Sequence, residues 1–325
     1  MRDAYPKFEA EGIRLYAISY DDQEALSEFA SKQNIPYPLL SDIDSDVISE
    51  FGILNTEIRK GDLFLYGIPF PSCYVADEEG VVVAKFFHDS YKKRDSPETL
   101  IDAALGRVQL PDNTPRATGG DDEVRITVAI QGGKGTIRQG MVRNLVVRFE
   151  LGKGLHVYGE PVPKGMVPVS ITVKPEPGLE VREPITPETQ PLHLEEAGIE
   201  LQVWSGSVDF LVPFYPTGAL ASEVRPLDMP SLPLEVSVRY QACDDHNCLL
   251  PRTEVFTLDV PLDVIDVPAI PLHMGHGQRH GNYDGMPHIR RLLARKTRAS
   301  PLGLLRFAVK AIGLEFAALR RRMKS

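Results

Sequence analysis

The spacing of apolar residues changes about one third of the way along the chain. Up to residue 107, short apolar runs alternate with segments in which apolar residues recur every three or four positions. From residue 123 to about 265, apolar and polar residues alternate with a period of two, and no helical segment intervenes. Because the two periods bury different faces, this change predicts an α/β domain followed by an all-β domain.

The first region, residues 1–107, reads as alternating strands and helices. Ile13–Ser19 is a short apolar run typical of a buried parallel strand. Arg2–Glu11 looks like the tail of a helix, and Asp21 or Asp22 can cap a second helix that ends at Gln33. Asp44 or Ser45 starts another short helix, with Val47, Ile48 and Phe51 facing inward. Two further strands, residues 72–76 and 81–87, are separated by a turn sequence, and a last helix opens at Ser96 with proline in its first position.

Residues 108–122 have the proline, glycine and aspartate content of a linker. Beyond them, six segments alternate and are rich in β-branched or aromatic residues. Such strands without intervening helices predict an antiparallel sandwich of immunoglobulin type over residues 123–265. The six segments are Val124–Val128, Leu145–Phe149, Val169–Val173, Val208–Phe214, Val236–Tyr240 and Val255–Val260.

Composition excludes several classes of protein. The 325 residues are 42% hydrophobic and 25% charged, which is ordinary globular usage. No apolar run approaches the ~18 residues that a membrane span needs. The start shows no signal peptide, which favours the cytoplasm, with the periplasm as the alternative if the N-terminus is incomplete. The net charge of −9 argues against nucleic acid as the main partner.

The first region resembles a known family in three segments: Tyr66–Val82, Ala17–Asp21 and Pro38–Asp42. All three resemble the redoxins of the alkyl hydroperoxide reductase/thiol-specific antioxidant superfamily. The resemblance implies a thioredoxin fold in which Pro71 is a cis proline that faces the reactive cysteine. A cis bond is physically plausible there because proline is the residue for which cis costs least.

The chain departs from the redoxins at the nucleophile. The family carries its reactive cysteine before the Ile13 strand, whereas no cysteine of this chain precedes Cys73. The family's central strand is missing too, which predicts that the Ile13 and Ser72 strands are not bridged. We expect an incomplete N-terminus, with a naturally inactive domain as the alternative. Cys73 itself is interpreted as a buried structural cysteine.

The second region is similar to another family. Arg239–Arg252 and Gly154–Tyr158 resemble the cysteine-bearing segment and an early strand of the N-terminal domain of the DsbD-type thiol:disulfide interchange protein. That domain is an immunoglobulin-like sandwich whose two cysteines shuttle a disulfide, so the resemblance implies a reversible redox pair at Cys243 and Cys248.

Two other interpretations of Cys243 and Cys248 stay open: a static structural disulfide and two free thiols in a reducing compartment. The four-residue gap and the presence of His246 alone argue against a zinc site. No cofactor or metal is implied.

The tail, residues 266–325, contains a histidine tract, interpreted as a linker without metal, and then a basic amphipathic helix. The tract has His273, His276 and His280, and His288 follows. From Ile289 the tail carries eleven basic residues and one acidic residue. We rank docking of this helix on protein ahead of docking on an anionic membrane surface.

These observations support two hypotheses. The first is a bacterial-type thiol-disulfide oxidoreductase that reduces peroxide or disulfide, takes electrons from a thioredoxin-like donor and uses Cys243 and Cys248 as a relay. The second is a non-enzymatic interaction protein with an inactive thioredoxin fold and a structural disulfide.

Overall fold

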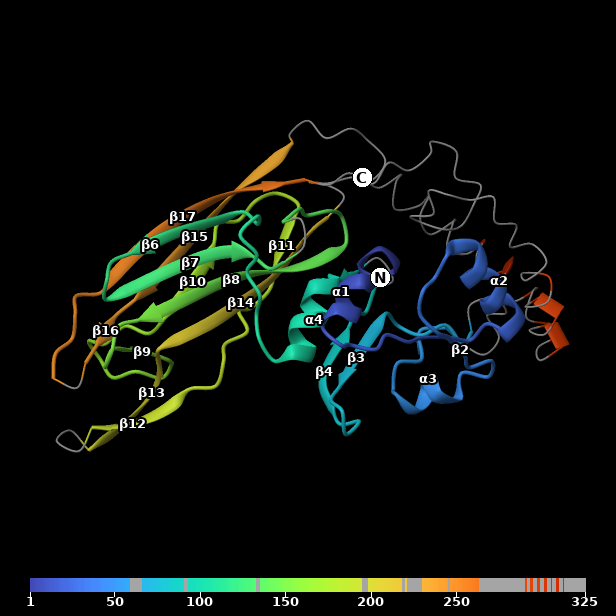
Figure 1. Ribbon diagram of the computed structural model, residues 1–325, viewed down its shortest axis with the longest axis horizontal. Coiled ribbons are helices and arrows are strands. Elements are labelled where there is room, and N and C mark those ends of the chain that lie inside the picture. Colours follow the sequence, from blue (N-terminus) through green and yellow to red (C-terminus); the bar gives the residue numbers. More distant parts are fainter. Residues whose placement is uncertain are drawn as a thin grey trace. The chain divides into compact units, whose positions relative to one another are not determined.

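The computed structural model describes residues 1–58, 66–90, 93–132, 135–194, 198–217, 220, 230–244 and 246–262, and separate positions between 290 and 312 (Figure 1). The chain forms two compact units. The first contains Met1–Tyr74 and Lys85–Tyr91, and the second contains Lys92–Gly277 with Val75–Ala84. Within the described residues, no helix is both long and apolar enough to cross a membrane.

The helices of the first unit begin where the sequence predicts. They are η1 (Arg2–Ala4), α1 (Tyr5–Ala10), α2 (Gln23–Gln33) and α3 (Asp46–Glu50). The side chain of Asp22 accepts a hydrogen bond of 2.8 Å from the Ala25 amide, which confirms the predicted cap of α2. The start of α3 is held by Asp42 instead, whose carboxylate accepts from the Ile48 amide at 2.8 Å.

The strands between Ala17 and Phe87 form two separate pairs. β1 (Ala17–Ser19) lies parallel to β2 (Leu39–Ser41), and β3 (Ser72–Ala76) pairs with β4 (Val82–Phe87). Among the described residues no ladder joins the two pairs. The prediction that the Ile13 and Ser72 strands are not bridged is therefore confirmed for this part of the chain.

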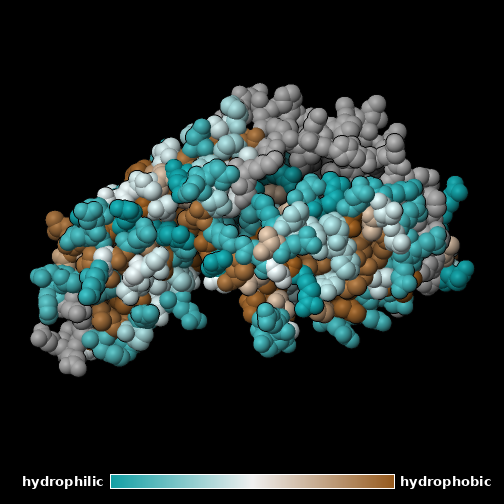
Figure 2. Space-filling model, in the orientation of Figure 1, coloured by the Kyte–Doolittle hydropathy of each residue, from teal (hydrophilic) through white to brown (hydrophobic). Residues whose placement is uncertain are grey.

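Much apolar surface of the first unit is exposed. Ile48 is 1% exposed, but its neighbours Val47 and Phe51, which the helical pattern places inward, are 40% and 47% exposed. Figure 2 shows apolar surface around α3 and β2. The expectation for Val47 and Phe51 is wrong, because α3 is only five residues long and buries a single side chain.

The second unit is a β-rich sandwich, as predicted. One sheet has the order β11-β14-β8-β7-β6, with β5 paired to β8, and a second has the order β10-β15-β17. A third, β12-β13-β9-β16, lies at one end of the unit (Figure 1). The strands are β5 (Arg94–Asp95), β6 (Arg116–Gly120), β7 (Val124–Ile130), β8 (Met141–Leu151), β9 (His156–Tyr158), β10 (Ser170–Val173), β11 (Leu179–Val181), β12 (Gln190–Leu194), β13 (Ile199–Ser205), β14 (Ser207–Pro216), β15 (Ser231–Tyr240), β16 (Ala242–Cys243) and β17 (Arg252–Pro261).

A continuous apolar core fills the sandwich. Phe149 stacks edge-on against both Phe210 and Tyr240, with ring centroids 5.6 and 5.4 Å apart, and all three side chains are fully buried. Trp204, the single tryptophan, packs against Phe210 at 4.8 Å. The alternation of β7, β8, β14, β15 and β17 produces this core by turning every second residue inward.

Helix α4 (Pro97–Leu105) is joined to the sandwich by buried polar side chains. The Ser96 hydroxyl caps the helix by accepting from the Thr99 amide at 3.3 Å. Gln131 of the segment after β7 donates to the Asp102 carboxylate at 2.6 Å, and Arg143 pairs with Glu98 at 3.3 Å. Burial raises the pKa of Asp102 to about 6.

The predicted linker contains a strand. Arg116–Gly120, within the segment that the composition assigns to a linker, forms β6 and pairs with β7 in register from Arg116↔Ala129 to Gly120↔Arg125. Gly119 and Gly120 weaken the strand signal of this segment, and β6 lies at the edge of its sheet. The histidine tract and most of the predicted basic helix lie outside the described residues.

Candidate functional site

The two cysteines of the second unit lie together and form a disulfide. Cys243 ends β16 and Cys248 lies five positions later, with the Cα atoms 4.0 Å apart. The two residues also face each other in an antiparallel bridge. Their environments differ: Cys243 is 0% exposed, whereas Cys248 is exposed. One sulfur-bearing residue is therefore sealed inside the domain and the other faces solvent.

The turn between the cysteines is held by Asp244. Its carboxylate accepts hydrogen bonds from the amides of His246 at 2.7 Å and Asn247 at 2.6 Å. These backbone bonds, that of His246 first, lower the pKa of Asp244. The Asp244 amide in turn donates to the Asn247 carbonyl at 2.9 Å. The turn is thus a tight, polar loop that presents Cys248 outward.

The strand β9 positions Cys243. β16 pairs with β9 so that Cys243 lies opposite His156 and Ala242 opposite Val157. Cys243 packs in a small apolar cluster with Tyr158, Leu201 and Val203. Because β9 is also paired with β13, the buried cysteine lies on the edge strand of a four-stranded sheet and not on a free loop.

A buried hydroxyl reaches the exposed cysteine. The Tyr158 hydroxyl lies 3.7 Å from the Cys248 Sγ and 3.3 Å from the His156 Nε2. Burial raises the pKa of Tyr158, so the phenol keeps its proton at neutral pH. His156 and Tyr158 lie two residues apart on one strand and therefore project to the same face. The His156 imidazole, the Tyr158 phenol and the Cys248 sulfur thus lie in contact one after another.

Gln241 ties the cysteine turn to the preceding loop. Its side-chain oxygen accepts from the Val167 amide at 3.0 Å, and its side-chain nitrogen donates to the Leu249 carbonyl at 3.1 Å. The side chain is 8% exposed, so both bonds are shielded from water. This amide fixes the segment that follows Cys248.

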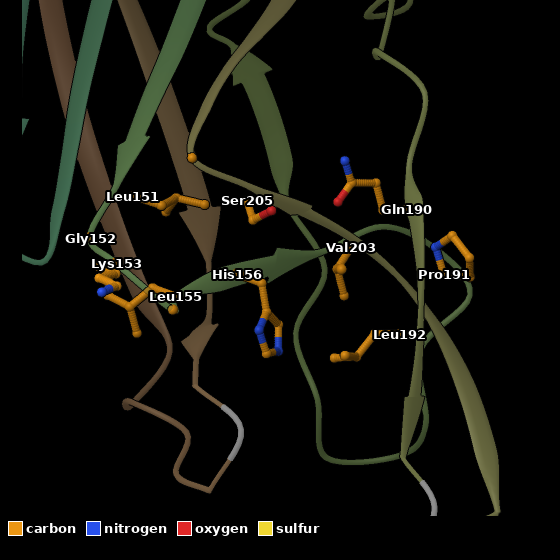
Figure 3. Close-up of a pocket in the computed structure, with 12 residues that line it drawn as sticks. Leu151, Gly152, Lys153, Leu155, His156, Gln190, Pro191, Leu192, Val203 and Ser205 are labelled. Atoms are coloured by element: carbon orange, nitrogen blue, oxygen red, sulfur yellow. The ribbon is translucent and has the colours of Figure 1, made fainter.

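A pocket of about 420 Å³ opens beside β9, and His156 is part of its wall. Figure 3 shows the side chains of His156, Val203 and Leu192 directed into the same space. The wall is formed by the β8–β9 turn and by β12 and β13, namely Leu151, Gly152, Lys153, Gly154, Leu155, His156, Gln190, Pro191, Leu192, Val203, Ser205 and Gly206. The pocket thus gives the His156 ring an opening to solvent.

The remaining sequence-predicted site residues lie elsewhere. Pro71 directly precedes β3 in the first unit, and the Phe70–Pro71 bond is trans, so the expected cis geometry is wrong. The preceding backbone is held extended, since the Phe70 amide donates to the Ile53 carbonyl at 2.7 Å, and trans is the favoured isomer by about 0.5–1 kcal/mol. Cys73 lies on β3 outside any disulfide and is half-buried, where the sequence interpretation expects a buried cysteine.

His246 lies on the cysteine turn with its side chain exposed. No group of three metal-binding side chains is found among the described residues. Sequence reasoning noticed the Gly154–Tyr158 segment but missed the roles of His156 and Tyr158. The available signal was their spacing of two positions, which places both side chains on the same face of a strand.

The site is a disulfide at one end of a β-rich domain, and comparisons with known proteins place both regions of the chain among known families. Residues 1–85 match the AhpC/TSA family, and residues 123–260 match the family described as thiol:disulfide interchange protein DsbD, N-terminal. The chain therefore carries an AhpC/TSA redoxin region followed by a DsbD N-terminal-like domain. Both resemblances noted in the sequence are confirmed.

Individual relatives extend this result. Chloroplastic peroxiredoxin Q of Arabidopsis thaliana is 38% identical over 104 residues, which cover 32% of this chain and 43% of that protein. The chain spans about half the length of the curated relatives it matches. The N-terminal periplasmic domain of ScsB from Proteus mirabilis aligns with 14% identity over 46% of this chain and 52% of that one, with a TM-score of 0.31. The complex between the DsbD and PilB N-terminal domains from Neisseria meningitidis aligns with 14% identity over 46% and 85%, with a TM-score of 0.24.

Proposed function

We propose that the chain is a thiol-disulfide oxidoreductase of the redoxin class in which Cys243 and Cys248 relay electrons. The observation that carries the proposal is the unequal burial of the two cysteines, because exchange needs a sulfur that a partner thiolate can reach, and Cys248 is the exposed one. In this proposal the redoxin domain spans residues 1–107 and the relay domain residues 123–265.

The accessible residue sets the order of steps. A partner thiolate attacks the Cys248 Sγ, the disulfide breaks with its electron pair passing to Cys243, and a mixed disulfide joins Cys248 to the partner. The second thiol of the partner then attacks the mixed disulfide and releases Cys248. Two electrons and two protons pass from the partner dithiol to the chain, and the partner is left as a disulfide.

The partner chemistry follows from the matched families. A thioredoxin-like dithiol would supply the electrons, as the match to the DsbD N-terminal family supports. The reduced pair would pass them to a disulfide, or to a redoxin cysteine that reduces peroxide, as the peroxiredoxin Q relatives suggest. The proposal also assigns to the first unit a thioredoxin-like fold that lacks the family's central strand.

A redox titration with thiol trapping and mass spectrometry tests the relay. We expect the pair to equilibrate with thioredoxin-like dithiols between about −180 and −270 mV. A pair that stays oxidised below about −300 mV is structural, and the relay is then abandoned. A pair that never forms under mild oxidation contradicts both the relay and the structural disulfide.

Single-cysteine variants test the order of attack. In a Cys73→Ser background, Cys243→Ser leaves the exposed Cys248, which should form a mixed disulfide with oxidised glutathione. The matched variant Cys248→Ser leaves the buried Cys243, which should react at least about 100-fold more slowly because a buried sulfur excludes the reagent. Equal rates would show that burial does not direct the attack.

A second function is favoured by one observation: the sequence has no cysteine before Cys73. The rival function is a non-enzymatic interaction protein whose redoxin region serves as scaffold. A Cys243–Cys248 pair that stays oxidised below about −300 mV supports this rival, because neither the disulfide nor Cys73 would then exchange with a partner thiol.

A further inference from the structure

We infer that Tyr158 and His156 form a proton relay that carries the proton of Cys248 away from the disulfide site and into the pocket beside β9. The inference rests on the proposed exchange function and assigns a route for the proton. It starts from two contacts of the Tyr158 hydroxyl, which lies 3.7 Å from the Cys248 Sγ and 3.3 Å from the His156 Nε2.

The oxidised state fixes the direction of the hydrogen bonds. A disulfide sulfur carries no proton, so in its contact with Cys248 the Tyr158 hydroxyl is the donor. A phenol has one proton, and its oxygen is left to accept from His156 Nε2–H. The same donor orientation stabilises a Cys248 thiolate after the disulfide is reduced, since hydrogen bonds to charged acceptors are the stronger ones.

The direction of both hydrogen bonds reverses when Cys248 is a protonated thiol. A Cys248 thiol donates to the Tyr158 oxygen, and the phenol then donates to a neutral His156 Nε2. When the thiol ionises, its proton passes to the Tyr158 oxygen while the phenol proton passes to the His156 nitrogen. No electrons move in this step, and the products are a thiolate, a neutral phenol and an imidazolium.

The pocket completes the route. The Tyr158 side chain is 2% exposed, so a proton cannot leave the site from the phenol directly. His156 is 6% exposed, yet its ring forms part of the pocket wall and points into that space (Figure 3). The imidazole can therefore exchange its proton with water in the pocket while the cysteine stays held against the domain.

The charged groups near His156 are few in the described part of the chain. Lys153 of the β8–β9 turn lines the same pocket and disfavours a charged imidazole. Asp244 of the cysteine turn favours it, since the charges of His246 and His156 both act on the Asp244 carboxyl. β12 and β13 contribute only uncharged side chains to the pocket wall, namely Gln190, Pro191, Leu192, Val203 and Ser205.

The test uses the reduced full-length chain and measures alkylation of Cys248 by iodoacetamide as a function of pH, resolved from Cys243 and Cys73 by peptide mass spectrometry. Tyr158→Phe should raise the midpoint of the Cys248 profile by about one to two pH units, because it removes the hydrogen bond that the phenol donates to the thiolate. His156→Gln should shift the midpoint in the same direction. His246→Gln, which removes an exposed histidine from the same turn, should leave it unchanged.

The double variant separates a relay from structural support. In a relay the two residues act in series, so Tyr158→Phe with His156→Gln should shift the midpoint no further than Tyr158→Phe alone. A structural role for His156 would add its full shift in the double variant and would overturn the relay. A Tyr158→Phe profile that coincides with that of the unchanged chain would overturn it too. Trp204 fluorescence, read on the strand paired with Val157, confirms that each variant is folded.

The relay and the exchange function fail in different ways. If the unchanged chain does not exchange with a thioredoxin-like dithiol but Tyr158→Phe still shifts the alkylation profile, the proposed function is wrong and the relay stands. If exchange is normal in both the unchanged chain and Tyr158→Phe and the profiles coincide, the relay is wrong and the function stands.

Discussion

The redoxin region and the sandwich differ in how completely they bury their own apolar residues. The sandwich encloses a continuous core in which Phe149, Phe210 and Tyr240 are at most 1% exposed. In the redoxin region, Ile18 and Leu40 are partners in the β1–β2 pair and are 36% and 46% exposed. Parallel strands are normally covered on both faces. The sandwich thus buries its apolar side chains within itself, whereas the redoxin region leaves part of its apolar surface exposed.

The largest expected effect on stability comes from a matched pair of variants that each remove one phenylalanine ring. Phe210→Ala should lower the free energy of unfolding of the sandwich by about 3–5 kcal/mol, because it removes a buried ring from Trp204 and Phe149. Phe51→Ala should cost about 1 kcal/mol or less in the redoxin region, since its ring is 47% exposed and its main aromatic contact is Tyr74 at 4.9 Å.

Two readouts are needed, one for each unit. Urea titration followed by Trp204 fluorescence reports on the sandwich, and hydrogen exchange of α2 and α3 reports on the redoxin region. The redoxin region should exchange faster than the sandwich in the unchanged chain. A cost for Phe51→Ala as large as that for Phe210→Ala would show that the redoxin region packs a core of its own.

The fold of the sandwich could be predicted because its signal is local. Period-two alternation located β7, β8, β10, β14, β15 and β17, and each forms where expected. β6 was missed because Gly119 and Gly120 weaken the alternation, although Gly119 packs so closely on Phe256 that a Cβ there would lie 2.8 Å from the ring. Capping residues likewise located α2 and α4.

The candidate site could be predicted only in part. The cysteine pair is visible in the sequence because Cys243 and Cys248 lie on one turn. The Tyr158 contact to Cys248 joins residues 90 positions apart, and no local pattern shows which strands bring them together. The trans Phe70–Pro71 bond was also beyond reach, because the isomer depends on the contacts around the proline.

An intermediate effect concerns the buried carboxyl between α4 and the sandwich. Burial raises the pKa of Asp102 to about 6, so between about pH 4 and 6 the folded chain holds a proton there that the unfolded chain releases. The contribution of Asp102 to the free energy of unfolding should therefore rise by about 2 kcal/mol as the pH falls from 7 to 4, and this contribution is lost as the pH rises through about 6.

Asp102→Asn is the matched control for that pH dependence. Asparagine keeps an oxygen that can accept from Gln131 and from the Gln109 amide, but it does not titrate. The difference in unfolding free energy between the two chains, measured by urea titration at several pH values, removes the contribution of every other group. A constant difference across the range would show that Asp102 does not carry the slope.

The smallest expected effect is that of Cys73→Ser. Cys73 is half-buried within β3 and is not at a helix N-terminus, where a thiolate would be stabilised. Since no cysteine precedes it, the 325-residue chain should turn over hydrogen peroxide at well under about 1 per second, and Cys73→Ser should change neither that rate nor exchange at the Cys243–Cys248 pair. Peroxide consumption by the purified chain is the measurement. Turnover at ordinary enzyme rates that disappears in Cys73→Ser would move the reactive sulfur into the redoxin region. The comparison would then reverse, because the less buried unit would hold the chemistry and the sandwich disulfide would serve structure alone.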